Sequence, residues 1–466
     1  MMLHSLKIAG LSWAIGLLAL SPLAVKADNS DILDSKPAQV EPDNLLYQAI
    51  LSAKMTLQAR VNDELTNPKF KPVVVKSKNT PIPVTLALWQ PVADQIVFVN
   101  GLKSGRRVTL NDNRNYDIKV KYDNGVNSQY IVAGEPKALV VAVIHPIYLS
   151  LGAKTRSQYK LQNTVYVPYH DYLKTAAIID EGKRFFATKI TAVYDEIAAL
   201  GVKSQAYPDK LLIDVIDPIL VKSIIAIEHA DNISRTSSQP AEFLDRFFVT
   251  LATNRHFSFA YSKSTASARG LAQFIPSTYK LMVKRRPELV LNPNFEQGMT
   301  DPYNAIKAEI GYLDDILSHL PQTIKNAGAA DDKKLGAYLA ASYNGGLARV
   351  IKAFEKWGDN WSASRVTLKK FYQQEKNTYL AGVKSLKQQL TGKQITTLEK
   401  AKLKQQLKIY KQHATAADQF YNLVNRYALK NETAYYIVKY NLIYDLLKAP
   451  NVIYSAALSK PRYAPS

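Results

Sequence analysis

Residues 217–231, D-P-I-L-V-K-S-I-I-A-I-E-H-A-D, decide how the second half of this chain is expected to fold. Asp217 followed by Pro218 is a typical helix start, because an aspartate caps free backbone N–H groups and proline suits the first helical position. Apolar residues then recur at helical spacing, at Leu220, Ile224 and Ile227. The stretch therefore predicts a helix with one stripe facing a core.

Glu228 is the carboxylate at the end of that stripe. It lies four residues beyond Ile224, on the flank of the apolar stripe rather than on the opposite, wet face. A carboxyl group held against apolar surface is partly desolvated and keeps its proton nearer to neutral pH. This property suits a general acid. The alternative is an ordinary boundary glutamate with its carboxylate in water.

Composition indicates a folded protein with more than one domain. The chain has 466 residues, of which 47% are hydrophobic and 21% charged, and these values suit two or three domains with sizeable cores. The net charge is +21, and nucleic acid is the first partner that such a charge suggests. The chain has no cysteine, so disulfides and thiolate chemistry are excluded.

The N-terminus argues against a nucleic-acid partner, because it is typical of an export signal. Residues 1–27 have a positive segment ending at Lys7, an apolar run from Ile8 to about Leu23, and a small-x-small cleavage signal before Asp28. The run is short for a membrane span. We therefore expect cleavage, a periplasmic location and no integral membrane span afterwards. Loss of the two leader lysines leaves a charge of +19, suited to an anionic envelope polymer or lipid surface.

The pattern along the chain predicts an α+β protein, with a small β-rich region before a long helical one. A helix is expected at 45–65, and runs of period two with turn signals between them suggest a small β-sandwich or barrel. The strand-like runs are 73–75, 84–89, 96–99, 116–122 and 138–144, with a hairpin turn at 123–125. The expected divisions are a signal peptide at 1–27, a linker and short helix at 28–66, a β-rich domain at 67–168, connecting helices at 169–210, a helical domain at 211–447 and a tail at 448–466.

A lysine-rich pair of helices is expected at 378–390 and 395–410. Residues 376–412 hold nine lysines and one glutamate, Glu399, for a local charge of +8. This segment is either a contact with an anionic surface or a solvated helical hairpin. Nothing in the β-rich region carries chemistry, so its sequence leads only to a spacer role or to docking. Envelope or secretion-complex proteins are candidate partners of this region or of the lysine-rich hairpin.

Further stretches of the helical half place polar side chains at a turn and at a helix end. Gly270 allows a tight turn, which puts Gln273 on a rigid segment where its amide can bind a sugar or an N-acetyl group. A helix of small residues ends at Gly345 and presents Tyr343 and Asn344.

Taken with Glu228, these stretches resemble the lytic transglycosylase family, the soluble lytic murein transglycosylase-like enzymes related to goose-type lysozyme. The family's catalytic glutamate at a helix end is similar to Glu228. The family's G-L-x-Q-x-x-P-x-T block is matched by Gly270-Leu271, Gln273, Pro276 and Thr278, and its A-Y-N-x-G block is similar to Ser342-Tyr343-Asn344-Gly345-Gly346. Its E-T-x-x-Y-[VI] block is matched by Glu432-Thr433 with Tyr436-Ile437. The family's D-P…Y-L helix is similar to Asp301-Pro302 with Gly311-Tyr312-Leu313. The resemblance covers about 211–447 and implies an all-α, lysozyme-like domain with 376–412 as a helical insertion.

The sequence departs from the family pattern in two places. His229 follows the glutamate where the family has serine, so either it supplies a hydrogen bond at the site or the site is altered. Residues 231–265 are longer than usual and rich in aromatic side chains. They are either a lid over the cleft or an extra packed helix.

The resemblance implies a peptidoglycan lytic transglycosylase. Glu228 would protonate the glycosidic oxygen between N-acetylmuramic acid and N-acetylglucosamine, while the muramoyl N-acetyl carbonyl assists at the anomeric carbon. It would then take the proton of the 6-hydroxyl, which closes a 1,6-anhydro ring. Substrate-binding roles would fall to Gln273, Tyr343, Asn344, Tyr436 and His229, with Tyr436 also orienting the acid.

This scheme needs one acid and no metal or cofactor. Most glycosidases use two carboxylates, whereas substrate-assisted ones use one. The blocks offer no second acid at comparable apolar spacing, and Asp231, which lies past the stripe, is expected to be solvated. The scattered histidines show no H-E-x-x-H spacing, and the chain has no G-x-S-x-G or P-loop motif.

Three alternatives stay open from the sequence. A lysozyme-like muramidase would use the same acid but deliver water. A non-catalytic peptidoglycan-binding protein of envelope assembly would keep the cleft without turnover, and His229 favours it. A nucleic-acid binder is opposed by the export signal and by the lack of a DNA- or RNA-reading motif.

Overall fold

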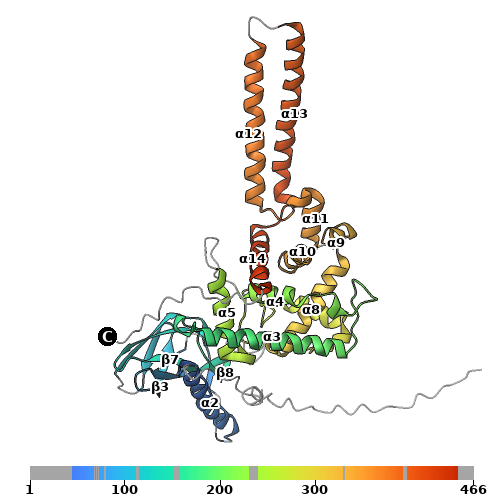
Figure 1. Cartoon of the computed structure of the whole chain (residues 1–466). Coiled ribbons are helices and arrows are strands. Elements are labelled where there is room, and N and C mark those ends of the chain that lie inside the picture. The colour runs from blue at the N-terminus through green and yellow to red at the C-terminus, as the bar shows by residue number, and fades with distance from the viewer. Residues whose placement is uncertain are drawn as a thin grey trace, which may run out of the picture.

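The computed structural model describes residues 45–67, 69, 71, 73–77, 80–111, 115–150, 158–229, 240–328, 331–391 and 396–449. The predicted signal peptide and nearly all of the predicted C-terminal tail lie outside the described residues. The described chain is an α+β protein in which an antiparallel sheet precedes a mostly helical region, as predicted (Figure 1). None of its described helices combines the length and the apolar character that crossing a membrane requires.

Within the described residues, eight antiparallel strands form one sheet, in the order β1-β8-β7-β2-β3-β4-β5-β6. The central strands β2 (Ile82–Gln90) and β7 (Leu139–Ser150) are nearly continuous apolar runs because both of their faces are buried. The other strands are β1 (Val74–Val75), β3 (Gln95–Ser104), β4 (Arg107–Leu110), β5 (Tyr116–Tyr122), β6 (Gln129–Gly134) and β8 (Tyr159–Tyr166).

The two faces of the sheet pack against different partners. One face, with Trp89 and Val141, joins helix α2 (Leu45–Thr66) and the helical region in a single core. The other face, with Leu86, packs against Ile118 and further residues of β5 and β6. The β-sandwich or barrel expected from the sequence is therefore one sheet whose β5–β6 end packs over its own centre.

Helix α4 (Pro218–Glu228) lies at the centre of the helical region. Asp217 caps it as predicted, with its carboxylate accepting from the Ile219 N–H at 2.7 Å. The predicted apolar stripe is buried, but so are Val221 and Ile225 on the other faces, so the helix is enclosed on all sides. The other helices are α3 (Ala176–Ala199), α5 (Pro240–Asn254), α6 (Pro276–Arg285), α7 (Phe295–Thr300), α8 (Pro302–His319), α9 (Gln322–Gly328), α10 (Asp332–Gly345), α11 (Leu347–Trp357), α12 (Arg365–Leu390), α13 (Thr397–Tyr427) and α14 (Asn431–Lys448).

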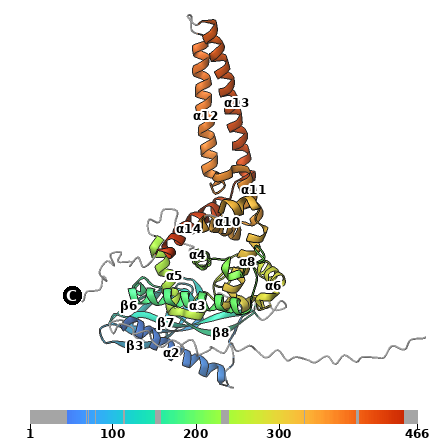
Figure 2. The same ribbon diagram turned by 45° about the vertical axis from the view of Figure 1, so that its right-hand side comes forward.

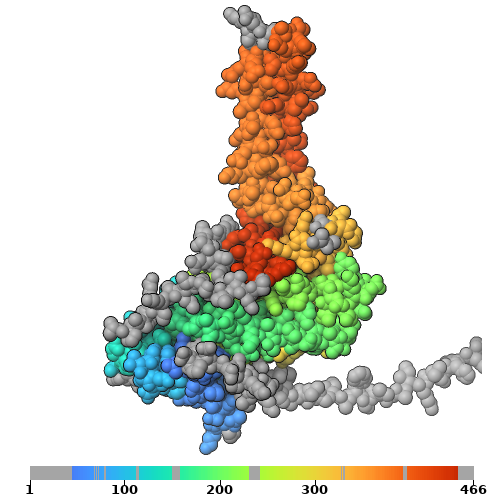
Figure 3. Space-filling model, in the orientation of Figure 1, coloured from blue at the N-terminus to red at the C-terminus, as the bar shows by residue number. Residues whose placement is uncertain are grey.

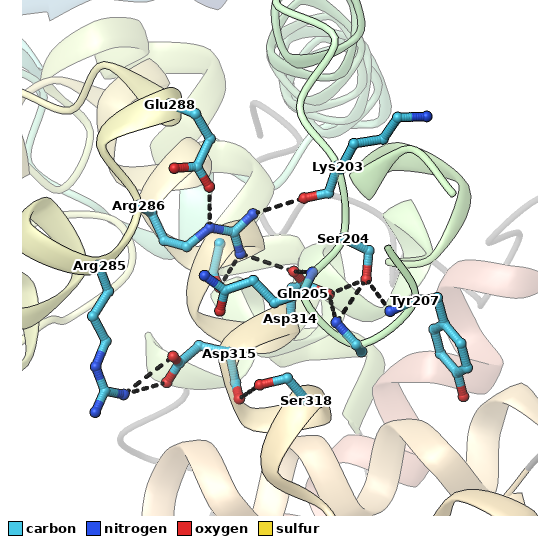
Figure 4. A network of polar contacts seen from close by, with 12 residues as sticks. Lys203, Ser204, Gln205, Tyr207, Arg285, Arg286, Glu288, Asp314, Asp315 and Ser318 are labelled. Atoms are coloured by element: carbon cyan, nitrogen blue, oxygen red, sulfur yellow. Dashed lines mark hydrogen bonds and ion pairs between the residues drawn. The ribbon is translucent and has the colours of Figure 1, made fainter. Parts of the chain in front are cut away.

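Helix α8 packs against α4 and is held by a buried ion pair at its C-terminal half (Figure 4). The guanidinium of Arg286 donates to the carboxylate of Asp314 at 2.8 Å, and both side chains are fully buried. The second oxygen of Asp314 accepts from the Ser204 hydroxyl, and a backbone N–H of the loop before α4 donates to the same carboxylate. This network ties α8 to the loop after α3 and to Arg286, which follows α6.

Helices α12 and α13 form the lysine-rich hairpin predicted from the sequence, and both are longer than expected. The hairpin projects away from the rest of the molecule (Figures 1 and 2). Its helices are joined side by side by an ion pair between Lys376 and Asp418 at 2.6 Å and by stacking of Tyr379 on His413. The exposed lysines of its outer part are Lys384, Lys387, Lys400, Lys402, Lys404, Lys408 and Lys411. Figure 3 shows how much surface the hairpin presents beyond the body.

The described part of the long aromatic segment, from residue 240 onward, contains a packed helix. Helix α5 crosses α3 so closely that a Cβ at Gly182 would meet the backbone of Phe248. Phe247 and Phe248 are buried, 2% and 4% exposed. The side chain of Asn254 hydrogen-bonds the N–H and the carbonyl of Val167, which ties the end of α5 to the sheet. These contacts favour the packed helix over the lid for the described part of this segment.

Candidate active site

Glu228 is the last residue of α4, and its carboxyl group is half-buried. The hydroxyl of Tyr436, on α14, donates to Oε1 of Glu228 at 2.7 Å. Tyr436 is 5% exposed. Burial, together with the carboxylate of Glu228, raises the pKa of Tyr436 well above its usual value, so the phenol keeps its proton and acts as a donor. Tyr436 and Glu228 are 208 residues apart in the sequence.

Gln273 lies in a strained turn whose residues Leu271 and Ala272 contact His229 and Tyr343. Gly270 has φ +69° and sits so close to the carbonyl of Met299 that a side chain would not fit. Gln273 itself has φ +49°, which non-glycine residues seldom adopt and which is typical of functional turns. Its side-chain amide donates to the Gly270 carbonyl at 2.7 Å and to the Ser262 hydroxyl at 3.1 Å. The turn therefore fixes the direction of the amide group.

His229 caps the end of α4 and ties it to the same turn. Its Nε2 lies 2.7 Å from the carbonyl oxygen of Leu271. Its ring stacks on Phe259, with the centroids 3.7 Å apart. Burial lowers the pKa of His229 to about 4 despite the hydrogen bond to Leu271, so the ring is neutral at neutral pH and Nε2–H donates. The geometry shows a link between α4 and the Gln273 turn.

Tyr343, on α10, joins that helix to the Gln273 turn. Its hydroxyl donates to the carbonyl of Ala272, and its ring packs edge-on against Phe274 with centroids 5.8 Å apart. Burial raises the pKa of Tyr343 well above its usual value, with nearby carboxylates adding to the effect. The next residue, Asn344, is exposed at the end of α10. The structure thus brings Glu228 and His229, Tyr436, the Gln273 turn and Tyr343 together from four separate segments.

Glu309 is a second carboxyl beside the site, and the sequence analysis missed it. It lies on α8 and is fully buried, with neither oxygen hydrogen-bonded to any described residue. Burial first, and then repulsion from Glu228, raises the pKa of Glu309 well above its usual value. The statement that no second acid occupies apolar spacing was therefore wrong. A signal existed, because position 309 lies three residues after Ile306 and four before Leu313 on the apolar face.

The arrangement suits proton transfer at Glu228, which, unlike Glu309, is not fully buried. Glu228 is half-buried and has a tyrosine donor on one oxygen, while Glu309 is sealed from solvent. Asp231 lies outside the described residues. Among the residues that the structure describes, no group of three or more His, Cys, Asp or Glu side chains could hold a metal ion.

Residues 255–363 match the family model described as the Transglycosylase SLT domain. This range contains the turn of Gln273 and the helix end of Tyr343, whereas Glu228 and Tyr436 lie on either side of it. No curated protein and no solved structure gave a significant match to the chain. The match and the surrounding geometry agree with the resemblance found in the sequence: the helical region of this chain contains a transglycosylase SLT domain, consistent with the lytic transglycosylase family.

Proposed function

We propose that this protein is a peptidoglycan lytic transglycosylase that cleaves the β-1,4 bond between N-acetylmuramic acid and N-acetylglucosamine and forms a 1,6-anhydro-muramoyl end. The SLT domain supports action on peptidoglycan. The observation that carries the finer proposal is the hydrogen bond from the Tyr436 hydroxyl to Glu228 at the C-terminal end of α4, where His229 links that helix end to the Gln273 turn.

Glu228 acts twice in this proposal. Protonated, it gives its proton to the glycosidic oxygen as the bond to the muramoyl C1 breaks, and the substrate's N-acetyl oxygen bonds to C1 in its place. The resulting carboxylate, stabilised by the Tyr436 hydroxyl at 2.7 Å, then takes the proton of the 6-hydroxyl as that oxygen displaces the N-acetyl group. A held hydroxyl of the same sugar has a large advantage of proximity over water.

The burial of Glu309 supports a one-carboxylate mechanism. A retaining glycosidase with two carboxylates places both beside the scissile bond, where each can touch the sugar. Glu309 is 0% exposed, so it cannot reach the substrate as a nucleophile or a base without unpacking α8. Of these two carboxyl groups, Glu228 alone is left to work with groups of the sugar itself.

The remaining site residues bind and orient in this proposal. Gln273 and Asn344 contact the N-acetyl group and ring hydroxyls, while Tyr343 holds the Gln273 turn through Ala272. His229 supplies its hydrogen bond to Leu271 rather than directly to the sugar.

Glu228→Gln tests the proposal on purified peptidoglycan sacculi. The natural chain should release anhydro-muropeptides, identified by mass spectrometry, and Glu228→Gln should release none while melting at an unchanged temperature. Glu355→Gln, at an exposed position on α11, is the matched control and should keep full activity. Reducing ends in place of anhydro ends would make the enzyme a muramidase. Binding to sacculi without any product would make the protein a non-catalytic envelope component.

We propose that the chain acts in the periplasm after removal of residues 1–27. N-terminal sequencing of protein recovered from the periplasm should begin at Asp28. An intact Met1 on recovered protein would contradict cleavage. The exposed lysines of the α12–α13 hairpin provide a surface for an anionic component of the envelope or for an acidic face of a secretion-complex protein.

A further inference from the structure

The α12–α13 hairpin begins and ends on helices that carry residues of the candidate site. In the chain it follows α10, which carries Tyr343, and α11, and it leads into α14, which carries Tyr436. Its base is closed by a backbone bridge between Ser364 and Leu429. Helices α10 and α14 pack directly on each other. A ligand of the hairpin is therefore held by the same helices that hold the site, although the hairpin itself projects away from the body (Figures 1 and 2).

Contacts between α12 and α13 show which of their residues face each other. Gly382 lies so close to the Tyr410 ring that a Cβ would clash with it. Val383 and Leu386 are buried on the same side of α12. On α13, Leu407 precedes Tyr410 by three residues and so shares its face. We call this line of contact the seam of the hairpin.

Five exposed lysines lie at the same offset from the seam on both helices. They are Lys384 and Lys387 on α12 and Lys404, Lys408 and Lys411 on α13, and they directly follow Val383, Leu386, Leu403, Leu407 and Tyr410. One residue further along is a turn of about 100° around the helix. Because the two helices are antiparallel, equal offsets place these lysines on one broad face, which we call the lysine face. The register of Gly382 with Tyr410 puts Lys384 beside Lys408.

The opposite broad face of the hairpin is nearly neutral. The residues one position before the seam are Ser385 and Gln389 on α12 and Lys402, Gln406 and Ile409 on α13, with one charge among them. A solvated helical hairpin is stabilised by lysines that alternate with acids three or four residues away, whereas lysines at that spacing repel one another. The uneven distribution of charge therefore favours a binding face over a solvated one.

Acids of the hairpin do not neutralise the lysine face. Between Lys376 and Asp418, which pair with each other near the base, the sequence contains one acid, Glu399. The carboxylate of Glu399 accepts from the N–H and the hydroxyl of Thr396 at the start of its own helix. The charge of the lysine face is thus available to an anionic ligand.

The side chains of the lysine face suit a solvated polymer better than a bilayer. Helices that lie on membranes bury a row of Trp, Phe or Leu side chains. Leu380 is the one exposed large apolar residue at the offset of the lysines, while Leu398 and Ile409 lie elsewhere on the hairpin. Lysine is a compact, strongly hydrated charge on a flexible stem, so it suits weak, exchangeable contacts with hydrated carboxylates.

We propose that the lysine face binds carboxylates of the peptide side chains of a peptidoglycan strand whose sugar backbone occupies the candidate site. The inference rests on the proposed function, because peptidoglycan is taken as the substrate. At about 1.5 Å per helical residue, the face lies roughly 24–33 Å from the base of the hairpin. It therefore touches a part of the strand remote from the bond that is cut. A second, remote contact raises the local concentration of the strand at the site, so it lowers KM and leaves kcat unchanged.

The test compares two double variants that change the charge of opposite faces by the same amount. Lys384→Gln with Lys408→Gln removes a neighbouring pair from the lysine face. Gln389→Glu with Gln406→Glu is the matched control on the opposite face. Each lowers the net charge by 2, and all four positions are exposed. Equal melting temperatures show that both variants fold.

Binding to purified sacculi is measured by sedimentation at low salt, with Glu228→Gln present in every chain to prevent digestion. We expect the lysine variant to bind about three- to tenfold more weakly, because exposed charge contacts are individually weak. The control should bind as the parent chain does. The difference should vanish at about 1 M salt. It should also vanish on sacculi whose carboxyl groups have been converted to neutral amides with a carbodiimide and ammonia. In chains with Glu228 intact, the lysine pair should raise KM by a similar factor.

Three results would overturn the inference. Equal weakening in both variants would mean that only the net charge of the protein matters. A difference that persists on amidated sacculi would exclude carboxylates as the ligand. Unchanged binding of the lysine variant to sacculi, with loss of binding to vesicles of anionic phospholipid, would assign the lysine face to a membrane.

The sedimentation assay also separates this inference from the proposed chemistry, because it needs no turnover. If sacculi bind through the lysine face but the natural chain releases no anhydro product, the proposed reaction fails and the binding face stands. If anhydro product forms and the two variants bind alike, the reaction stands and the binding face fails.

Discussion

Removing the Tyr436 hydroxyl is the sharpest single change to the site. In Tyr436→Phe the ring keeps its packing, while Oε1 of Glu228 loses the donor that lies 2.7 Å away. The bond is made to the carboxylate form, which develops as Glu228 gives up its proton. The variant therefore loses an interaction that strengthens on the way to the transition state.

The size of the effect follows from the burial of the two partners. A hydrogen bond to a charged group contributes about 1.5–3 kcal/mol, and each 1.4 kcal/mol is about tenfold in rate. Because Glu228 is half-buried, a water molecule can replace part of the lost bond. We therefore expect the lower part of that range, a loss of roughly 10- to 30-fold in kcat/KM.

The assay is anhydro-muropeptide release from sacculi, with Tyr440→Phe as the matched control. Tyr440 lies one turn further along α14, is fully buried, and its hydroxyl has no hydrogen-bond partner among the described residues. Its removal should leave activity unchanged. Natural activity in Tyr436→Phe, or an equal loss in both variants, would refute the role given to the Tyr436–Glu228 bond.

The other predictions concern stability and surface charge. Asp314→Ala leaves the guanidinium of Arg286 buried without its ion-pair partner, so the free energy of unfolding should fall by about 3–5 kcal/mol in denaturant titrations; an unchanged midpoint would contradict the anchoring of α8. The pKa of His229 is lowered from 6.5 to about 4, so the unfolded chain binds this proton at higher pH than the folded chain, and stability should fall as pH drops through that interval. His229→Gln should remove that part of the fall, and an identical pH dependence would argue against a buried neutral ring. If the hairpin contacts an anionic component, Lys402→Glu combined with Lys404→Glu should weaken binding to sacculi and reduce the salt dependence of that binding. Unchanged binding would show that these lysines of the hairpin do not contact the sacculi.

The central helix was predictable because its signals are local. Asp217 and Pro218 set the start of α4, and the spacing of apolar residues predicted a buried stripe. The periodicity did not show that α4 is enclosed on every face. That depends on helices from distant parts of the chain, including α14, which carries Tyr436. The pairing of Tyr436 with Glu228 followed only from the resemblance between blocks.

Glu309 shows where pattern reading failed. An apolar helix face is recognised by its Ile and Leu residues, and an acid among them gives no signal of burial because a buried, unpartnered carboxyl is rare. The long segment before residue 265 likewise could not be assigned as lid or helix. Its position depends on contacts of α5 with the sheet, such as the hydrogen bond between Asn254 and Val167. Such contacts produce no periodic pattern in the sequence.

The strand predictions differ in quality for a similar reason. Strand β5 (Tyr116–Tyr122) was found with correct bounds because it alternates apolar and polar residues. Strands β4, β6 and β8 were missed because buried and exposed residues do not alternate regularly along them. Their extended conformation depends largely on pairing with neighbouring strands. The curling of the β5–β6 end over the centre of the sheet has no local signature.

The account's central claim is that the sugar's own 6-hydroxyl, and not water, completes the reaction with Glu228 as the only carboxyl that handles the proton at the substrate. Digestion of sacculi in water enriched in a heavy oxygen isotope, followed by mass spectrometry of the new muramoyl ends, tests it most directly. We predict ends that are lighter by one water than reducing ends and that carry no isotope from the solvent. Muramoyl ends that take up the heavy oxygen at the moment of cleavage would contradict the account.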